Sequence, residues 1–397
     1  MITLNDKTSP NPDSLKFLFY SFCLLFFLLP IAKSPPLIVG GLTLLIWLLS
    51  GSFIKDYKIW LQQDWVPPVV FFMLLPWVGL IWTNDIEKGI SFAEKSYYWL
   101  FAFAISSIPY GRTVYFIWAF IAGLSLNVII AILQNIGIVP YLREDFATGL
   151  LTGINPYISY SLVLVFGMLI LSFYFGKTDK KWLKISIIIL IAAYIFNLSI
   201  IYGRSGYIAF ILLSPLLLYN LIGKRHFLKS IAAAVVITVL FLLSPMVQHR
   251  ISLIKEEAAL YYQGQKITSV GLRLHMWEGA IRIFMNNPLI GVGTGGFQKA
   301  LKQYDPDPSL PGLDQPHNSL LYMATSFGIL GIVSILWLFV VFLKKGWKHR
   351  NNISGYSMLM FGIILIIGSM TDNQVLSRIT GIIFALFMGM RLEEDET

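Results

Sequence analysis

The sequence is poor in charge. Only 13% of its 397 residues are Asp, Glu, Lys or Arg, and 56% are hydrophobic, whereas a soluble domain carries about 25% charged residues. So few charged side chains cannot cover the surface of a soluble globule of this size. An ordinary soluble domain, a coiled coil and a disordered chain are therefore excluded, and we expect a membrane protein.

Cysteine is nearly absent as well. Cys23 is the single cysteine and lies within an apolar run, so the chain can form no internal disulfide and offers no pair of thiolates to zinc. No cluster of His, Asp and Glu has the spacing of a metal site, and the sequence contains neither a Walker A nor a G-x-S-x-G motif. We therefore expect a function that uses no metal and no cofactor.

Long apolar runs are what the sequence has in abundance. A helix of about 20 apolar residues crosses a bilayer core, which is about 30 Å thick. The runs that approach this length predict an all-α polytopic membrane protein with about 12 transmembrane helices, nine of them within 1–247 and three within 317–397. These runs are 15–33, 36–54, 66–82, 97–110, 113–134, 154–175, 185–202, 205–222, 229–247, 317–343, 355–371 and 374–391.

Lys and Arg predict the orientation of the chain. If both termini are cytoplasmic, 17 of the 30 Lys and Arg residues lie in cytoplasmic segments, which carry a net charge of +8, against +1 on the other side. This bias is the one that the positive-inside rule describes. It explains the overall charge of +9 as a topology signal rather than as affinity for nucleic acid. The hydrophilic segment 248–316 is then a long loop on the outer side.

The outer loop contains two helical patterns. Residues 250–262 mix charged and apolar side chains, and residues 272–286 have apolar positions at near-helical spacing. Both predict amphipathic helices that lie on the membrane surface or pack on the bundle. In the second helix Glu278 and Arg282 stand four residues apart, in the order that favours an ion pair. Arg273 has no acid three or four residues away, so it is the better candidate ligand for an anion.

Two polar residues stand at the outer edges of predicted spans. Arg204 follows Gly203 at the mouth of the eighth span, where it either binds a ligand or extends its guanidinium into water. His317 opens the tenth span after Pro316, a residue typical of helix starts. The positive end of a helix dipole disfavours a charged imidazole, so His317 would be neutral and able to act as a general base. The alternative is a polar histidine at the membrane interface.

Three other patterns have simpler explanations than the functional ones they suggest. Residues 291–296 read G-x-G-x-x-G, but without a βαβ unit they predict a glycine-rich turn rather than a dinucleotide site. Residues 305–307 read Asp-Pro-Asp, the spacing of metal-dependent glycosyltransferases, but the prolines favour a rigid loop. Asp372 and Arg378, near the last span, are candidates for a buried structural pair.

Three segments, taken in order, resemble signatures of the O-antigen ligase/polymerase superfamily. They are a short element around an arginine, an R-x-x-x-W segment followed by P-x-x-G-x-G, and H-N-x-x-L followed by G-x-x-G. In this chain the elements are Tyr202-Gly203-Arg204-Ser205-Gly206, then Arg273 and Trp277 with Asn287-Pro288, Gly291 and Gly293, then His317-Asn318 and Leu321 with Gly328 and Gly331.

The resemblance implies an inverting, metal-independent glycosyltransferase of the bacterial inner membrane, with its active site at the periplasmic face. Its partners would be a glycan on undecaprenyl diphosphate, a lipid A–core acceptor and membrane lipids. The residues implied in the site are His317 as general base, Arg204, Arg273 and more weakly Arg282 as ligands of the diphosphate, and Asn318 and Trp277 as supporting residues.

Two alternatives to a ligase remain. A polymerase of the same superfamily shares the core, but a large outer loop directly before the histidine span is typical of ligases, so we expect a ligase. A polytopic transporter is the alternative from a different class. It would need ionisable residues or broken helices near the middle of the membrane, whereas the polar residues of this chain gather at one face.

Overall fold

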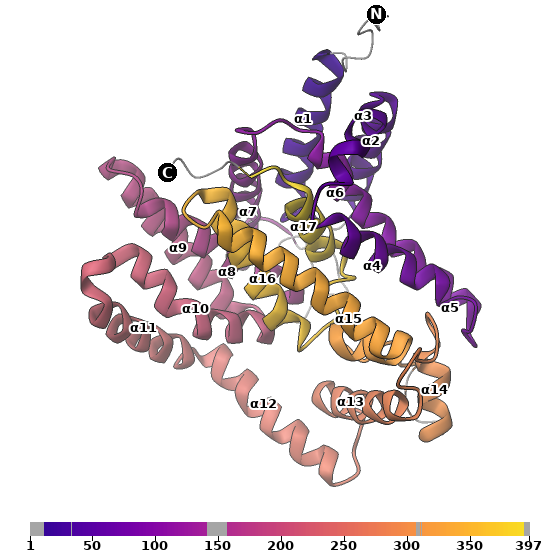
Figure 1. Cartoon of the computed structure of the whole chain (residues 1–397). Coiled ribbons are helices and arrows are strands. Elements are labelled where there is room, and N and C mark those ends of the chain that lie inside the picture. The colour runs from indigo at the N-terminus through magenta and orange to yellow at the C-terminus, as the bar shows by residue number, and fades with distance from the viewer. Residues whose placement is uncertain (1–11, 33, 141–156, 307–309, 311, 393–397) are drawn as a thin grey trace, which may run out of the picture.

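The computed structural model describes residues 12–32, 34–140, 157–306, 310 and 312–392 (Figure 1). This part of the chain forms helices and contains no strand, as the apolar runs predict. The helices are α1 (Pro12–Leu28), α2 (Pro35–Leu49), α3 (Ser52–Trp60), α4 (Val66–Val78), α5 (Ile86–Ala93), η1 (Glu94–Trp99), α6 (Leu100–Ser106), α7 (Thr113–Asn135), α8 (Tyr157–Phe175), α9 (Lys181–Ile200), α10 (Arg204–Ile222), η3 (Lys224–His226), α11 (Phe227–Leu242), α12 (Pro245–Tyr262), α13 (Ser269–Asn286), α14 (Phe297–Tyr304), α15 (Ser319–Lys348), α16 (Ile353–Ser369) and α17 (Arg378–Gly389).

The helices confirm a polytopic membrane protein. Among the described residues, five helices are each long and apolar enough to cross a bilayer: α7, α8, α9, α10 and α15. Two bent pairs, α2 with α3 at 88° and α11 with α12 at 72°, raise the count to seven if each pair is one span. The helices α4, α16 and α17 are apolar but shorter. The count of twelve spans therefore stays a prediction, as does the side of the membrane on which each loop lies.

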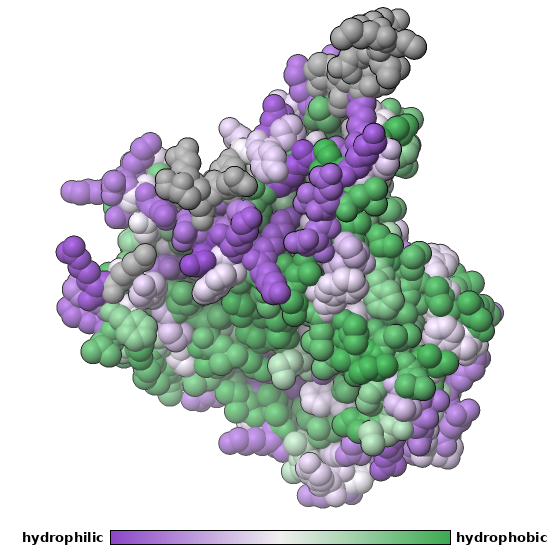
Figure 2. All heavy atoms as spheres, viewed as in Figure 1, coloured by the Kyte–Doolittle hydropathy of each residue, from purple (hydrophilic) through white to green (hydrophobic). Residues whose placement is uncertain are grey.

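Burial separates the helices of the bundle centre from those at its edge. Of the 18 residues from Ile158 to Phe175 in α8, 78% are buried within the protein, against 28% of the apolar window in α9. Helix α8 packs against α10 and α16, so it lies at the centre of the bundle, while α9 exposes Ile185, Ile188 and Ile189. Figure 2 shows a hydrophobic band across the molecule, between a hydrophilic edge near the ends of α9 and α15 and another over α12 to α14.

The predicted span 97–110 differs most from the structure. Its only α-helix is α6, whose 7 residues cover about 10 Å, roughly a third of a bilayer core. The residues from Phe101 to Ser106 are buried, and Ser106 accepts a hydrogen bond from Trp60 Nε1 at 2.8 Å. The apolar side chains of this segment are therefore buried inside the protein, and α6 alone is too short to span a bilayer core.

The long hydrophilic segment is helical, as its two patterns predict. Helix α12 covers the first pattern and α13 the second, and a short third helix, α14, was not predicted. Helix α12 already begins at Pro245, so the predicted boundary between 247 and 248 falls inside a helix. The three helices lie together at one edge of the molecule (Figure 1), and α13 packs against α15.

Helix α15 breaks at a glycine, and the glycine-rich turn fills the break. Gly328 has φ 60° and ψ −141°, outside the helical region, which interrupts the backbone ladder of the helix. The freed groups find partners in the turn: Val292 N donates to Thr325 O at 2.9 Å, and Ile329 N donates to Pro288 O at 2.8 Å. Because an unpaired backbone group is costly inside a membrane bundle, this turn has a structural role, and the prediction of a glycine-rich turn is confirmed.

Replacing Gly291 with alanine should destabilise this junction. Gly291 has a φ of +66°, and a Cβ there would lie 2.4 Å from the carbonyl oxygen of Thr325. The left-handed conformation alone costs a residue with a Cβ about 1–2 kcal/mol, and the clash adds to it. We expect a lower midpoint of thermal unfolding in detergent. Gly41→Ala is the matched control, since no atom lies within 4 Å of its added Cβ, and an unchanged midpoint for Gly291→Ala would contradict the junction's role.

Candidate functional site

His317 forms a pair with a carboxylate 55 residues later in the chain. His317 Nδ1 lies 2.8 Å from Asp372 Oδ1, and the same oxygen accepts a hydrogen bond from Asn373 N at 2.8 Å. Because an ionised carboxylate only accepts hydrogen bonds, Nδ1 donates to Asp372, and in a neutral imidazole with this arrangement Nε2 keeps the lone pair. This tautomer leaves His317 able to take up a proton at Nε2, and the side chain of His317 is 37% exposed.

The backbone at His317 is unusual. Its φ is +47°, and it is the only residue other than glycine with a positive φ in the described part of the chain. Such a conformation costs about 1–3 kcal/mol and persists only where the surroundings fix it. The neighbours do so here: the side chain of Asn318 caps α15 by accepting from Leu321 N at 3.0 Å, and its Nδ2 donates to Met370 O at 3.1 Å.

Trp277 joins the histidine turn to the helices of the outer segment. Its Nε1 donates to Pro316 O at 2.9 Å, which ties α13 to the residue directly before His317. On the other side of the turn, Ser319 Oγ donates to Asn373 Oδ1 at 3.2 Å. The turn that carries His317 is therefore held from α13 and from the segment that follows α16, the two elements that flank it.

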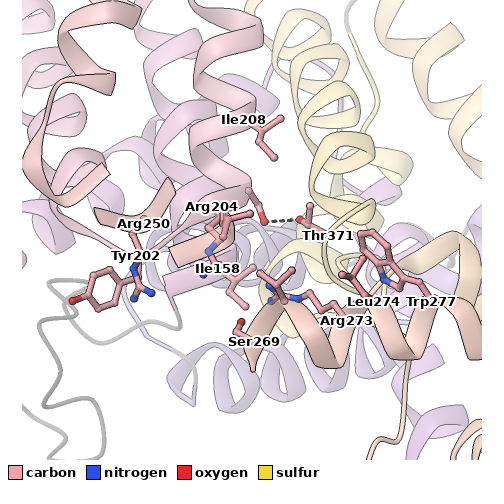
Figure 3. Close-up of a pocket in the computed structure, with 13 residues that line it drawn as sticks. Ile158, Tyr202, Arg204, Ile208, Arg250, Ser269, Arg273, Leu274, Trp277 and Thr371 are labelled. Carbon is pink, nitrogen blue, oxygen red and sulfur yellow. Dashed lines mark hydrogen bonds between the residues drawn. The ribbon is translucent and has the colours of Figure 1, made fainter. Parts of the chain in front are cut away.

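Three arginines line one cavity beside this turn. The cavity, of about 230 Å³, lies between α8, α10, α12, α13 and the segment after α16. Arg204 comes from α10, Arg250 from α12 and Arg273 from α13 (Figure 3). Trp277 and Thr371 also line it, and these two connect it to the histidine turn, because Trp277 bonds to Pro316 and Thr371 directly precedes Asp372.

The cavity is strongly cationic. No Asp or Glu is among the residues of the described chain that line it. Among the described residues, Arg204 lies 3.8 Å from the acid Glu257, and both side chains are 17% exposed. The guanidinium of Arg250 lies over the ring of Tyr202, 3.2 Å from its centroid. Arg273 forms no ion pair with any residue that the structure describes, as its sequence neighbours predict. Convergent guanidinium groups of this kind suit a ligand with several phosphate oxygens.

Arg282 lies apart from the other two predicted arginines. It lines a separate cavity of about 160 Å³, together with His275, Glu278 and Asp305. The reason is helical geometry, since the nine residues between Arg273 and Arg282 correspond to about half a revolution. The predicted ion pair between Glu278 and Arg282 is also wrong, because no such pair within 4.0 Å is found between these two described residues.

The predicted pair of Asp372 and Arg378 is wrong as well. Asp372 bonds to His317 instead, and no ion pair joins it to Arg378, although both residues belong to the described part of the chain. Arg378 begins α17 and lies near Lys95. Burial lowers the pKa of Lys95, the charge of Asp314 opposes this, and the charge of Arg378 lowers it slightly further.

The Asp-Pro-Asp segment shows no sign of a metal site in the residues that can be placed. Asp305 forms an ion pair with Lys266, and His275 Nδ1 lies 3.6 Å from Asp305 Oδ2. Asp307 lies outside the described residues. Within the described ranges, no three His, Cys, Asp or Glu side chains are grouped so that they could hold a metal ion.

The sequence did not predict a role in the site for two of its residues, Arg250 and Asp372. Arg250 stands at the first position of the predicted helix 250–262, where nothing local distinguishes it from a surface cation. Asp372 was noticed as an acid near a span, but its partner was assigned wrongly. The only signal in the sequence was a charge near the edge of a span, which a surface residue has as well, so only the fold shows which side chains these two residues face.

Two comparisons with known proteins find similar sequences. Residues 189–336 match a family model described as O-Antigen ligase, and this range contains Arg204, Arg250, Arg273 and His317. The chain is also 27% identical, over 264 residues, to a curated O-antigen ligase of Salmonella typhimurium. That alignment covers 59% of this chain and 62% of the relative, so the chain spans less than two thirds of the relative's length.

Proposed function

We propose that this chain, which matches an O-antigen ligase family model over residues 189–336, is a ligase that transfers a glycan from undecaprenyl diphosphate to a hydroxyl of lipid A–core oligosaccharide. The reaction takes place at the periplasmic face of the bacterial inner membrane, with both termini of the chain in the cytoplasm. It inverts the anomeric carbon and needs no metal. The observation that carries the proposal is a cavity lined by three arginines next to the turn that holds the histidine–aspartate pair.

His317 acts as the general base. Its Nε2 accepts the proton of the acceptor hydroxyl while the hydroxyl oxygen attacks the anomeric carbon of the donor. Asp372 accepts the hydrogen bond from Nδ1, which keeps the ring in the useful tautomer and stabilises the imidazolium formed in the transition state. The proton must leave His317 before the next turnover, and the partial exposure of the ring gives water access for this step.

The arginines bind the diphosphate of the donor. When the bond between the anomeric carbon and the diphosphate oxygen breaks, the electron pair goes to that oxygen and negative charge grows on the leaving group. Arg204, Arg250 and Arg273 face the same cavity and stabilise this charge without reorganisation. Glu257 neutralises part of the charge of Arg204, so Arg250 and Arg273 contribute the larger share. A single displacement of this kind gives inversion.

Reconstitution tests this function and separates it from the alternatives. The purified protein is placed in liposomes with an undecaprenyl-diphosphate glycan and a lipid A–core acceptor, in the presence of a metal chelator. A single large addition to the core is the result expected of a ligase. A growing ladder on the lipid-linked donor would identify a polymerase, and movement of the glycan across the bilayer without transfer would identify a transporter. Activity that disappears with the chelator and returns with a divalent cation would contradict the metal-independent mechanism.

Trp277→Phe should slow transfer without preventing it. The change removes the Nε1 hydrogen bond to Pro316 O and keeps an aromatic ring, so the histidine turn loses its hydrogen bond to α13. We expect kcat to fall about 10-fold, as for the loss of one hydrogen bond, with KM for the donor nearly unchanged. Trp82→Phe is the matched control, because it removes a Trp hydrogen bond to Ile290 O away from the turn. Equal losses of activity in both variants would argue against a positioning role for Trp277.

A further inference from the structure

A second large cavity lies at the other end of the bundle. It is a groove of about 1110 Å³ between α8, α10, α15 and α16. Asn220, which lines it, is 16 residues after Arg204 on α10, or about 24 Å along the helix. The groove is therefore separate from the arginine cavity, and the mechanism proposed above makes no use of it.

The walls of the groove are hydrocarbon. Phe173 and Tyr356 stack at a centroid distance of 4.2 Å, and the amide of Asn220 is already engaged, since its Nδ2 donates to Tyr356 Oη at 2.8 Å. The aliphatic side chains that line the groove are Leu216, Leu343, Leu359, Met360 and Ile363. Such a lining offers few hydrogen bonds and favours an apolar occupant.

The rim of the groove is cationic. Lys344, Lys348 and Arg350 line it, no acid does so among the residues described, and none of the three has a carboxylate within 4.0 Å in the described part of the chain. Arg350 is held in place, because its guanidinium lies 4.3 Å from the ring centroid of Trp347 and donates to Trp347 O at 2.8 Å. By contrast, the neighbouring Lys345 donates to backbone carbonyls at the end of α17 and does not line the groove.

The position of the rim relates it to the membrane surface. The three cations stand at or just after the end of α15, a helix long and apolar enough to cross a bilayer, and Trp347 beside them is 59% exposed. Trp, Lys and Arg at the end of a span are typical of the boundary between hydrocarbon and water. A ligand in this groove thus has its charged part at the boundary and its apolar part along the helices.

We propose that this groove binds one anionic glycerophospholipid. Its phosphate lies on Lys344, Lys348 and Arg350, and its acyl chains lie against the aliphatic wall. A zwitterionic lipid would leave the three cations without a net counter-charge, and a soluble anion would leave the hydrocarbon wall exposed. Basic pockets between transmembrane helices bind anionic headgroups in this way. The lipid bridges α10 and α15–α16, so its binding stabilises the folded bundle. This inference does not depend on the proposed function.

Lipid binding to the full-length protein in detergent tests the charged half of the proposal. Phosphatidylglycerol and phosphatidylcholine with the same acyl chains are compared by native mass spectrometry and by thermal unfolding. We expect one tightly bound phosphatidylglycerol that raises the unfolding midpoint, and no such effect of phosphatidylcholine. The triple variant Lys344→Ala, Lys348→Ala, Arg350→Ala should bind phosphatidylglycerol roughly 100-fold more weakly, at about 5-fold for each cation. The control Lys180→Ala, Lys181→Ala, Arg225→Ala removes equal charge outside the groove and should bind normally.

A second pair of variants tests the apolar half. Ile363→Trp fills the groove without changing its charge and should abolish tight phosphatidylglycerol binding, whereas Leu212→Trp, on the exposed face of α10, should not. Binding that survives Ile363→Trp but is lost in the triple variant would reduce the site to adsorption on a basic surface and overturn the proposal. Equal binding of the two phospholipids would overturn it as well, and so would displacement of phosphatidylglycerol by an equimolar amount of undecaprenyl phosphate.

Discussion

Replacing His317 with alanine is expected to lower the rate of glycan transfer by about 10²–10⁴-fold, the usual contribution of a positioned general base. This corresponds to about 3–5 kcal/mol of transition-state stabilisation. The loss should appear in kcat, because the imidazole contributes to proton transfer rather than to donor binding. The measurement is initial-rate transfer in liposomes at saturating donor and acceptor. His317 is 37% exposed, so the variant should still fold and insert, which its unfolding midpoint in detergent will show.

Asp372→Asn sharpens this prediction. An asparagine amide can donate to Nδ1 and thereby reverse the tautomer of His317, so that Nε2 carries the hydrogen and cannot accept a proton. In a serine protease triad the same change lowers kcat by about 10⁴-fold although the geometry is preserved. We expect Asp372→Asn to be nearly as inactive as His317→Ala, and the double variant to be little worse than either. Near-normal transfer by His317→Ala, or additive losses in the double variant, would refute a base oriented by this carboxylate.

Local sequence properties were enough to predict the helices and most of the cationic site. The apolar runs predict α7 to α10 and α15, because a run that is continuous along the chain can be recognised without knowing the fold. Arg204 and His317 were singled out because a polar residue at the edge of an apolar run is costly unless it has a role, and Arg273 because no acid lies three or four residues away. The position of Arg282 and Arg273 on opposite faces of one helix could also be predicted from the sequence, since it depends only on 3.6 residues per turn.

Other features could not be predicted from the sequence, because they depend on contacts between segments that are distant in the chain. Asp372 faces His317 across 55 positions, and Arg378, only six residues away, looked like an equally good partner. The run 97–110 has the hydropathy of a span, but α6 is surrounded by protein, and hydropathy does not distinguish protein from lipid. Arg250 lies at the cavity because of the bend between α11 and α12, which the sequence does not predict.

Removing one of the cavity arginines is expected to lower kcat by about 10²–10³-fold, as for the loss of one donor to a charge that develops in the transition state. The structure predicts an order among them. Arg204 shares its charge with Glu257, whereas Arg273 forms no ion pair with the described residues, so Arg273→Gln should be the more harmful change. Arg273→Lys should recover only part of the rate, because the ammonium keeps the charge and loses the bidentate fork.

Arg250→Gln is the decisive variant of the series, because only the fold identifies this residue. If Arg250 stabilises the leaving diphosphate, its loss lowers kcat, and if it holds the donor before reaction, its loss raises KM. Either result supports a three-arginine site. Arg282→Gln is the matched control, since it removes the same charge from the neighbouring cavity and should leave both constants unchanged. A loss for Arg282→Gln equal to that for Arg250→Gln would mean that the general positive field of the outer helices, rather than this cavity, attracts the donor.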